Sequence, residues 1–336
     1  MNLPSRFYRS LTAESDLNSN KEPSSINSVK WTDDGLYAMT CSEDRCIRLY
    51  NPHKSSSLSS LDSDASLVHV YNGVHGYGVL DVAIAKDNSK FVSCGSDRNC
   101  FLWDVLNKKV VRRIPAHSKK TNCVVMSNDN NVLITASNDK TIKLWDLRTN
   151  DRDPIQSLDQ FTDSVTSSII TPDQTNIISG CVDGHIYKHD IRMNQITTDN
   201  LIQSVTHVSL FSHNKKCILA SCLGENHLSP SLVLLEFESG EVLQTYKGHA
   251  NSKFKISHSS SDDNNTVVTG TEDGHILMYD LVNGTKRLKF GRDDEDDRGH
   301  DTGSVVTAVD WHPSQALLLS ADSEGKVILW KPSRFK

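Results

Sequence analysis

The sequence lacks the features that mark membrane, secreted and zinc-binding proteins. None of its eight cysteines forms a Cys-x-x-Cys pair, and no paired Cys/His spacing indicates a metal site. No apolar run approaches about 18 residues, the length needed to span a membrane. The N-terminal stretch MNLPSRFYRSLTAESD has no apolar core and therefore does not predict a signal peptide. The sequence also predicts no cofactor.

An excess of basic residues is also absent. The chain has 36 Lys and Arg against 42 Asp and Glu, for a formal charge of −6. Nucleic-acid-binding domains are usually strongly basic, so nucleic acid is not the expected partner. Most of the cysteines fall within predicted strands, as small buried residues do, which favours reduced thiols in a cytoplasmic or nuclear protein.

The sequence does contain a repeated spacing of three residue types. A Ser or Thr is followed four positions later by an acidic residue, and six positions after that by a bulky residue. Six repeats keep this spacing: Thr40/Asp44/Tyr50, Ser93/Asp97/Trp103, Thr135/Asp139/Trp145, Ser179/Asp183/His189, Thr269/Asp273/Tyr279 and Ser320/Glu324/Trp330. A seventh is degraded, with Leu235 and Glu236 as its final pair. The bulky positions lie 42 to 53 residues apart, a period typical of WD-repeat β-propellers.

Seven repeats predict a single all-β domain over residues 1–336, a seven-bladed WD-repeat β-propeller. β-branched runs between Asn, Asp and Gly are typical of short strands, and a fourth strand follows the first three, as at residues 109–114 and 242–246. The repeats are expected at residues 25–52, 74–105, 116–147, 159–191, 200–237, 247–281 and 300–332.

The last repeat has no room for its fourth strand, because six residues follow Trp330. An unpaired sheet edge there would be a template for aggregation. Residues 6–11 precede the first complete repeat and are not otherwise assigned. We therefore expect them to form the outer strand of the last blade.

Four histidines precede the repeat acids at a regular distance of 22 or 24 residues. We expect each acid to accept from an imidazole, which bonds a Ser or Thr hydroxyl that also reaches the bulky residue. The four expected networks are His75, Ser93, Asp97 and Trp103; His117, Thr135, Asp139 and Trp145; His249, Thr269, Asp273 and Tyr279; and His300, Ser320, Glu324 and Trp330.

A Ser, His and Asp set also suggests a hydrolase. The set recurs at the same spacing in several repeats, however, and no Gly-x-Ser-x-Gly elbow accompanies it. We therefore interpret the networks as structural, and predict no catalytic residue and no enzyme activity.

Three insertions interrupt the repeats: Ser-rich residues 53–66, residues 223–231, and acidic residues 291–303. The simplest interpretation is solvated loops, because loop closure costs little more as length grows. The alternatives are a phosphorylated segment and a charged contact for a basic partner.

Loop residues just after the histidines are candidates for a partner-binding rim, because exposed aromatic and cationic side chains often anchor interfaces. They are Tyr77, Lys119, Lys120, Lys253 and Phe254. Two further candidates, Arg148 and Arg192, follow Asp146 and Asp190 by two residues. Substrate receptors of cullin-RING ubiquitin ligases carry similar Trp-Asp-x-Arg motifs, although a surface Arg paired with a nearby acid is the simpler and preferred explanation.

Several strings are more specific than the repeat itself. They are HGYGVLDVA at residues 75–83, VVRR at 110–113, SLDQ at 157–160, SGCVDGHIYKHDIRMNQ at 179–195 and ESGEVLQTYKGHANSKFK at 238–255. In these strings the chain resembles the mitogen-activated protein kinase organiser family, also called WD repeat domain-containing protein 83. It departs from that family in its three insertions and at Gly78, where the family usually has an acidic residue.

The resemblance implies a non-enzymatic scaffold. That family assembles components of the extracellular-signal-regulated kinase (MAP kinase) cascade and is also associated with spliceosomes. The expected partners are therefore MAP kinase pathway components or spliceosomal proteins, bound by a monomer in the cytoplasm and nucleus. Neither a small-molecule substrate nor a membrane is expected. The alternative function is a substrate receptor of a cullin-RING ubiquitin ligase.

Overall fold

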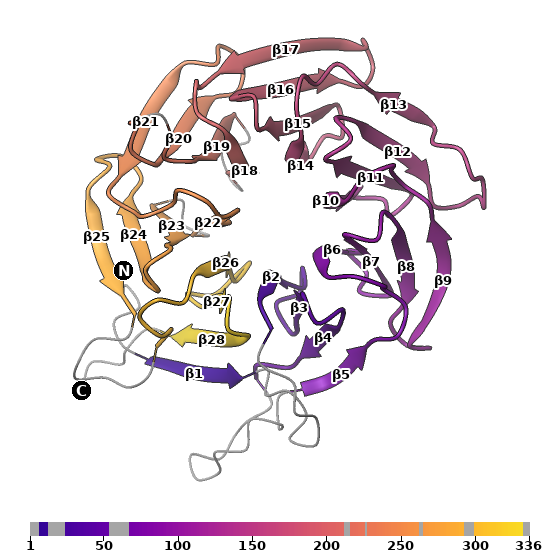
Figure 1. Cartoon of the computed structure of the whole chain (residues 1–336), viewed down its shortest axis with the longest axis horizontal. Coiled ribbons are helices and arrows are strands. Elements are labelled where there is room, and N and C mark those ends of the chain that lie inside the picture. The colour runs from indigo at the N-terminus through magenta and orange to yellow at the C-terminus, as the bar shows by residue number, and fades with distance from the viewer. Residues whose placement is uncertain are drawn as a thin grey trace. The chain divides into compact units, whose positions relative to one another are not determined.

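The computed structural model describes residues 7–12, 24–53, 67–211, 216–225, 227–261, 265–291 and 299–331. These residues form 28 strands in seven four-stranded antiparallel sheets, matching the seven predicted blades (Figure 1). They form no helix, and hence none that could cross a membrane. The chain divides into two compact units, one of residues 75–255 and one of the residues on either side. The assignment of residues 1–336 to a single domain stays a prediction.

The unit of residues 75–255 holds four sheets whose strands pair in chain order. The first two sheets contain β6 (Val79–Ile84), β7 (Lys90–Gly95), β8 (Cys100–Asp104) and β9 (Lys109–Ile114), then β10 (Thr121–Met126), β11 (Val132–Ser137), β12 (Ile142–Asp146) and β13 (Gln156–Leu158). The next two contain β14 (Val165–Ile170), β15 (Asn176–Cys181), β16 (His185–Asp190) and β17 (Gln195–Asn200), then β18 (Val205–Leu210), β19 (Cys217–Cys222), β20 (Ser231–Glu236) and β21 (Val242–Lys247).

The other unit holds three sheets. Two of them pair in chain order: β2 (Ile26–Trp31), β3 (Ala38–Ser42), β4 (Ile47–Tyr50) and β5 (Leu67–Tyr71), and β22 (His258–Ser260), β23 (Thr266–Gly270), β24 (Ile276–Asp280) and β25 (Lys286–Phe290). The third contains β26 (Val306–Trp311), β27 (Leu318–Asp322) and β28 (Lys326–Lys331). Its outer strand is β1 (Phe7–Thr12), antiparallel to β28, so the predicted pairing of the two ends of the chain is confirmed, shifted by one residue (Figure 1).

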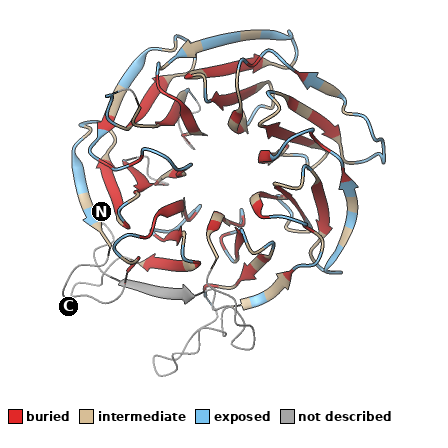
Figure 2. Cartoon of the chain, in the orientation of Figure 1, coloured by how far each residue is buried: buried red, intermediate tan, exposed pale blue. Residues whose placement is uncertain are grey.

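In the six sheets whose side chains are described for all four strands, the first three strands are more deeply buried than the fourth (Figure 2). Strands β7 and β8 are almost wholly buried, whereas every residue of β17 is exposed or half-buried. Neighbouring sheets share their cores. Val92 and Leu102 of one sheet, for example, lie in the same buried cluster as Leu133 and Trp145 of the next. The Trp of the repeat is thus a core residue, which is why the spacing is kept.

A bulge near the start of the first strand recurs in six of the seven described sheets, for instance between Val79 and Asp81. It directs a polar side chain toward the next sheet. Asp81 Oδ2 accepts the backbone N–H of Val124 at 3.1 Å, and Ser167 Oγ accepts that of Val208 at 2.8 Å. The first strand of a sheet would otherwise leave backbone donors unpaired at its edge, so these bonds join sheets and satisfy donors together.

Asp310 makes the same kind of link in the other unit. Its Oδ2 accepts the backbone N–H of Trp31 at 2.8 Å, and its own carbonyl accepts from the Trp31 indole at 3.3 Å. Burial raises the pKa of the Asp310 carboxyl to about 6, although the bond from Trp31 and the charge of Lys30 oppose that rise. The carboxyl group therefore makes a hydrogen bond between two sheets, in a buried position that disfavours its ionised form.

Candidate functional site

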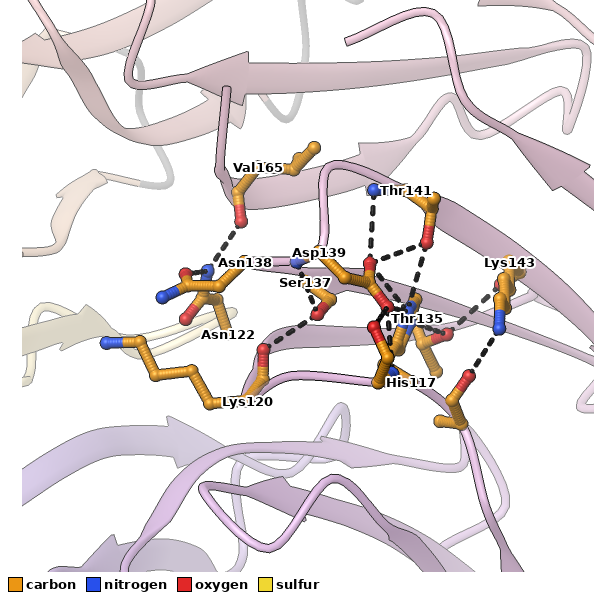
Figure 3. Close-up of polar contacts among 12 residues, drawn as sticks. His117, Lys120, Asn122, Thr135, Ser137, Asn138, Asp139, Thr141, Lys143 and Val165 are labelled. Atoms are coloured by element: carbon orange, nitrogen blue, oxygen red, sulfur yellow. Dashed lines mark hydrogen bonds and ion pairs between the residues drawn. The ribbon is translucent and has the colours of Figure 1, made fainter. Parts of the chain in front are cut away.

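The third repeat contains the complete predicted network, of which Figure 3 shows His117, Thr135 and Asp139. His117 lies on the loop before β10, and its Nδ1 is 3.0 Å from Asp139 Oδ2 in the turn between β11 and β12. Its Nε2 is 2.8 Å from Thr135 Oγ1, which also accepts from the Trp145 indole at 3.0 Å. The bonds join a loop, a turn and two strands of one sheet.

The ionisation of Asp139 fixes the direction of these bonds. Burial alone would raise the pKa of its carboxyl, but the hydrogen bonds from His117 and Thr141 outweigh that effect and hold the pKa well below its usual range. A carboxylate can only accept, so His117 donates to Asp139 from Nδ1, and its Nε2 is left to bond the Thr135 hydroxyl. Every member of the network then has a partner.

The second repeat has the same network. His75 Nδ1 is 2.8 Å from Asp97 Oδ2, and its Nε2 is 2.7 Å from Ser93 Oγ. The Trp103 indole donates to that hydroxyl at 2.9 Å. The hydroxyls of Ser93 and Thr135 are wholly buried, so no substrate can reach them, which supports the structural interpretation over a hydrolase.

In the last repeat the predicted acid is wrong. His300 Nδ1 bonds Asp322 Oδ2 at 2.7 Å, while Glu324 is exposed. Asp322 Oδ1 accepts the backbone N–H groups of Glu324 and Lys326, so the carboxylate that closes the turn is also the one that faces the imidazole. The rest of the network is as predicted, with Ser320 Oγ between His300 Nε2 and the Trp330 indole.

In the sixth repeat Thr269 and Asp273 have local partners, and the full predicted set stays a prediction. Thr269 Oγ1 donates to the carbonyl of Gly270 at 3.1 Å, and Asp273 accepts from the Thr271 hydroxyl. Tyr279 is fully buried, and burial raises the pKa of its phenol. His249 is buried in the other compact unit, so its contact with Asp273 stays a prediction.

The first and fourth repeats, which lack the leading histidine, use other partners. Asp44 pairs with Arg48 at 2.5 Å. In the fourth repeat Phe161 packs edge-on against Tyr187, with ring centroids 4.7 Å apart, and the Tyr187 hydroxyl donates to Asp183 at 2.8 Å. Sequence reasoning missed the aromatic pair. Its signal was an aromatic residue four positions before β14, where His117 stands relative to β10.

His189, the bulky residue of the fourth repeat, is buried, and neither ring nitrogen has a hydrogen-bond partner among the described residues. Burial lowers the pKa of its imidazole, which is therefore neutral. It stands four residues after His185, a spacing that presents a metal ligand pair on a helix. Both residues lie on β16, where four residues span roughly 13 Å, too far for one metal ion.

The candidate rim residues are all exposed. Tyr77 is 66% exposed and Phe254 is 44% exposed, and Lys119, Lys120 and Lys253 also face solvent. In Figure 3 the Lys120 side chain extends away from the His117 network. The structure therefore leaves large aromatic and cationic groups on the loops while burying the network hydroxyls.

The two motif arginines differ. Arg148 forms a double contact with Asp146, Nε to Oδ1 at 3.1 Å and Nη2 to Oδ2 at 2.8 Å. This pairing holds the pKa of Asp146 at about 2. Arg192 is exposed, and its backbone N–H donates to Asp190. Arg148 thus fits the simpler interpretation of a surface Arg paired with a nearby acid.

The insertions are described in part. Residues 54–66 and 292–298, which make up most of the Ser-rich and acidic insertions, lie outside the described residues. The insertion at 223–231 is described except for residue 226. No disulfide joins the eight cysteines, all of which lie among the described residues, and burial raises the pKa of Cys222 to about 12, so it is not a reactive thiolate.

Comparison with known proteins agrees with this architecture. The family model "WD domain, G-beta repeat" matches residues 15–51 and 65–104, and "NWD2 C-terminal beta-propeller" matches residues 111–329. Propellers of this class are generally non-enzymatic platforms for protein interaction.

Relatives in distant organisms match nearly the whole chain. The WD repeat domain-containing protein 83 homolog of Dictyostelium discoideum is 30% identical, over 92% of this chain and 95% of that protein. WD repeat domain-containing protein 83 of Homo sapiens is 33% identical and that of Xenopus tropicalis 35% identical, each over 93% of this chain and 90% of the relative. The chain therefore belongs to the WD repeat domain-containing protein 83 family of seven-bladed WD-repeat β-propellers.

Proposed function

We propose that this chain is a non-enzymatic scaffold that brings together proteins of the extracellular-signal-regulated kinase cascade, of the pre-mRNA splicing machinery, or of both. Family membership supports a scaffold, and the strings shared with the kinase organiser family support these two settings. The scaffold works in the cytoplasm and nucleus, and it binds proteins without a cofactor.

One observation carries this proposal: the polar sets that could do chemistry are buried, whereas the loops present interface-type side chains. Ser93 and Thr135 are wholly buried. Tyr77 and Phe254 present much of their aromatic surface to solvent. Aromatic side chains and cations supply much of the energy of protein interfaces. The loops are thus suited to holding a partner.

Hydrogen bonds place the rim loops at the same end of their sheets. The Lys255 ammonium reaches the carbonyls of Asn122 and Thr166 at 3.0 and 2.9 Å, which brings the segment containing Lys253 and Phe254 beside the starts of β10 and β14. On the other side, the Cys94 thiol contacts the carbonyl of Thr121, the residue after Lys120. We define the loop rim as Tyr77, Lys119, Lys120, Lys253 and Phe254.

Changing the loop rim should weaken partner capture without unfolding the chain. We expect Tyr77→Ala combined with Lys120→Glu to reduce recovery of at least one kinase-cascade or splicing protein about tenfold, because a desolvated anchor contributes at least about 1–2 kcal/mol. The measurement is quantitative affinity purification from cell extract, with melting temperatures recorded in parallel. Val111→Ala with Lys109→Glu is the matched control, because both residues are exposed on β9. Unchanged recovery from the rim variant would rule out this surface.

The ligase alternative is tested beside it. A pocket of about 270 Å³ adjoins Arg148, lined also by Lys90, Met126 and Leu147. This offers a place for a cullin adaptor to contact the arginine. Loss of a cullin adaptor from Arg148→Ala with Arg192→Ala, with the rim variant unaffected, would replace the scaffold function with that of a substrate receptor.

A further inference from the structure

The insertion in the fifth repeat is held firmly by one buried amide. The Gln203 side chain donates from Nε2 to the carbonyls of Leu223 and Ser229, at 2.7 and 3.0 Å. Its Oε1 accepts from the Ser231 hydroxyl at 3.1 Å. Gln203 thus bonds both ends of the insertion at residues 223–231. Both ends are therefore held in a fixed position against the loop before β18.

A second set of contacts joins this insertion to two neighbouring loops. The Ser204 hydroxyl lies 2.8 Å from the carbonyl of Val182 and 3.0 Å from Glu225 Oε2. The backbone N–H of Gly224 donates to the carbonyl of Asn251 at 2.9 Å. The turn before β16, the loop before β18 and the insertion therefore meet at one end of the third and fourth sheets of their unit.

Each of the three loops exposes an aliphatic side chain there. Val182 is 38% exposed, Ile202 is 79% exposed and Leu228 is 48% exposed. The carbonyl of Val182 accepts one of the hydrogen bonds that join the loops. Ile202 and Leu228 are each next to a residue that takes part in another. We call Val182, Ile202 and Leu228 the aliphatic patch.

Ile202 is the unusual member of the patch. Its φ is +69°, in the left-handed region that β-branched residues avoid, and the Asn200 side chain holds it there by accepting its N–H at 2.8 Å. Such a conformation is strained for a β-branched residue. Because the side chain is mostly exposed, packing within the chain does not offset this strain. Strain combined with exposure points to a side chain used for contact with another molecule.

The three loops that carry the patch contain acidic side chains and no Lys or Arg. Residues 182–185, 201–204 and 223–231 contain Asp183 and Glu225 but no Lys or Arg. His185 lies 3.3 Å from Asp183, and His227 is exposed on the insertion. Among neighbouring cations, the Lys140 ammonium donates to the carbonyl of Thr162, whose hydroxyl donates to Asp183, and the Lys255 ammonium binds two carbonyls. Glu225 is therefore the acid that a partner can use. A partner that covers the aliphatic patch would therefore gain by presenting positive charge.

We propose that the aliphatic patch docks a short peptide segment of a partner protein, with an aliphatic anchor against Ile202 and a Lys or Arg beside Glu225. This proposal rests on the scaffold function and adds the chemistry of a partner. The patch uses loops different from those of the loop rim, so the two surfaces can be tested apart.

A random 12-residue peptide library displayed on phage is panned against the wild-type chain, and the enriched peptides are sequenced. We expect sequences that combine Leu, Ile or Val with Lys or Arg. Their synthetic versions should bind Ile202→Asp at least about tenfold more weakly in fluorescence anisotropy, because an interface anchor is lost. Leu106→Asp is the control, since Leu106 is 86% exposed on the turn between β8 and β9.

Two more variants separate binding from folding and from charge. Ile202→Gly removes the side chain at a positive φ that glycine accepts, so it should lose binding while the melting temperature is kept or raised. Glu225→Gln keeps an acceptor for Ser204 but should weaken binding of the basic peptides roughly threefold. The proposal is overturned if no peptide is enriched, if the enriched peptides are acidic, or if they bind Ile202→Asp as tightly as wild type. In those cases the rim experiment still decides the scaffold function.

Discussion

Asp322→Ala is expected to lower the free energy of unfolding by roughly 3–5 kcal/mol, because a buried partner of several groups is removed. The Asp322 side chain is wholly buried and accepts from His300 and from the backbone N–H groups of Glu324 and Lys326. Its loss leaves a buried imidazole and two backbone donors without their acceptor. Chemical denaturation followed by tryptophan fluorescence measures the change.

Glu324→Ala is the matched control, since Glu324 is the acid that the repeat spacing selects and its side chain is exposed. We expect it to change stability by less than about 0.5 kcal/mol, as surface substitutions usually do. Equal losses in the two variants, or a greater loss for Glu324→Ala, would show that the last network is not built as described.

Deleting residues 1–12 is the second change with a large expected effect. It removes β1, which pairs with β28 over six residues from Phe7↔Lys331 to Thr12↔Lys326. We expect the free energy of unfolding to fall by roughly 3–6 kcal/mol, at about 0.5–1.5 kcal/mol for each lost hydrogen bond. We also expect aggregation through the exposed edge of β28. Thermal unfolding with simultaneous light scattering measures both effects.

Deletion of residues 55–64 provides the comparison, because these residues fall between β4 and β5 and lie outside the described strands. Polar connecting segments of this kind tolerate deletion. The 55–64 variant should unfold cooperatively near the wild-type temperature. If the two deletions aggregate alike, β1 is not the strand that completes the last sheet.

The strands could be predicted from the sequence because the pattern that forms them is local. Val110, Val111 and Ile114 are β-branched residues in a short run between turns, and β9 falls at the predicted residues 109–114. The Trp103 and Trp145 networks were predicted for the same reason. Every member stands at a fixed distance along the chain, and the repeat keeps that distance.

Residues were assigned wrongly or missed where spacing along the chain does not determine which way a side chain points or what surrounds it. Asp322 and Glu324 are both acids near the same turn, and the turn geometry decides which one faces His300. The bond from Val124 to Asp81 depends on a bulge that no composition signal marks. Ile202 gives no sign in the sequence of a positive φ, because β-branched residues normally avoid that conformation and only the folded turn shows the bond to Asn200 that holds it.

The most direct test of the scaffold function is lysine cross-linking of native complexes. The complexes are isolated through the tagged full-length chain, treated with a lysine-reactive reagent and analysed by mass spectrometry. The account predicts that Lys119, Lys120 and Lys253 of the loop rim cross-link to partner proteins, and do so more often than the exposed Lys109 and Lys286 on the outer strands β9 and β25. Partner cross-links confined to the outer-strand lysines, or a chain recovered without stable protein partners, would contradict it.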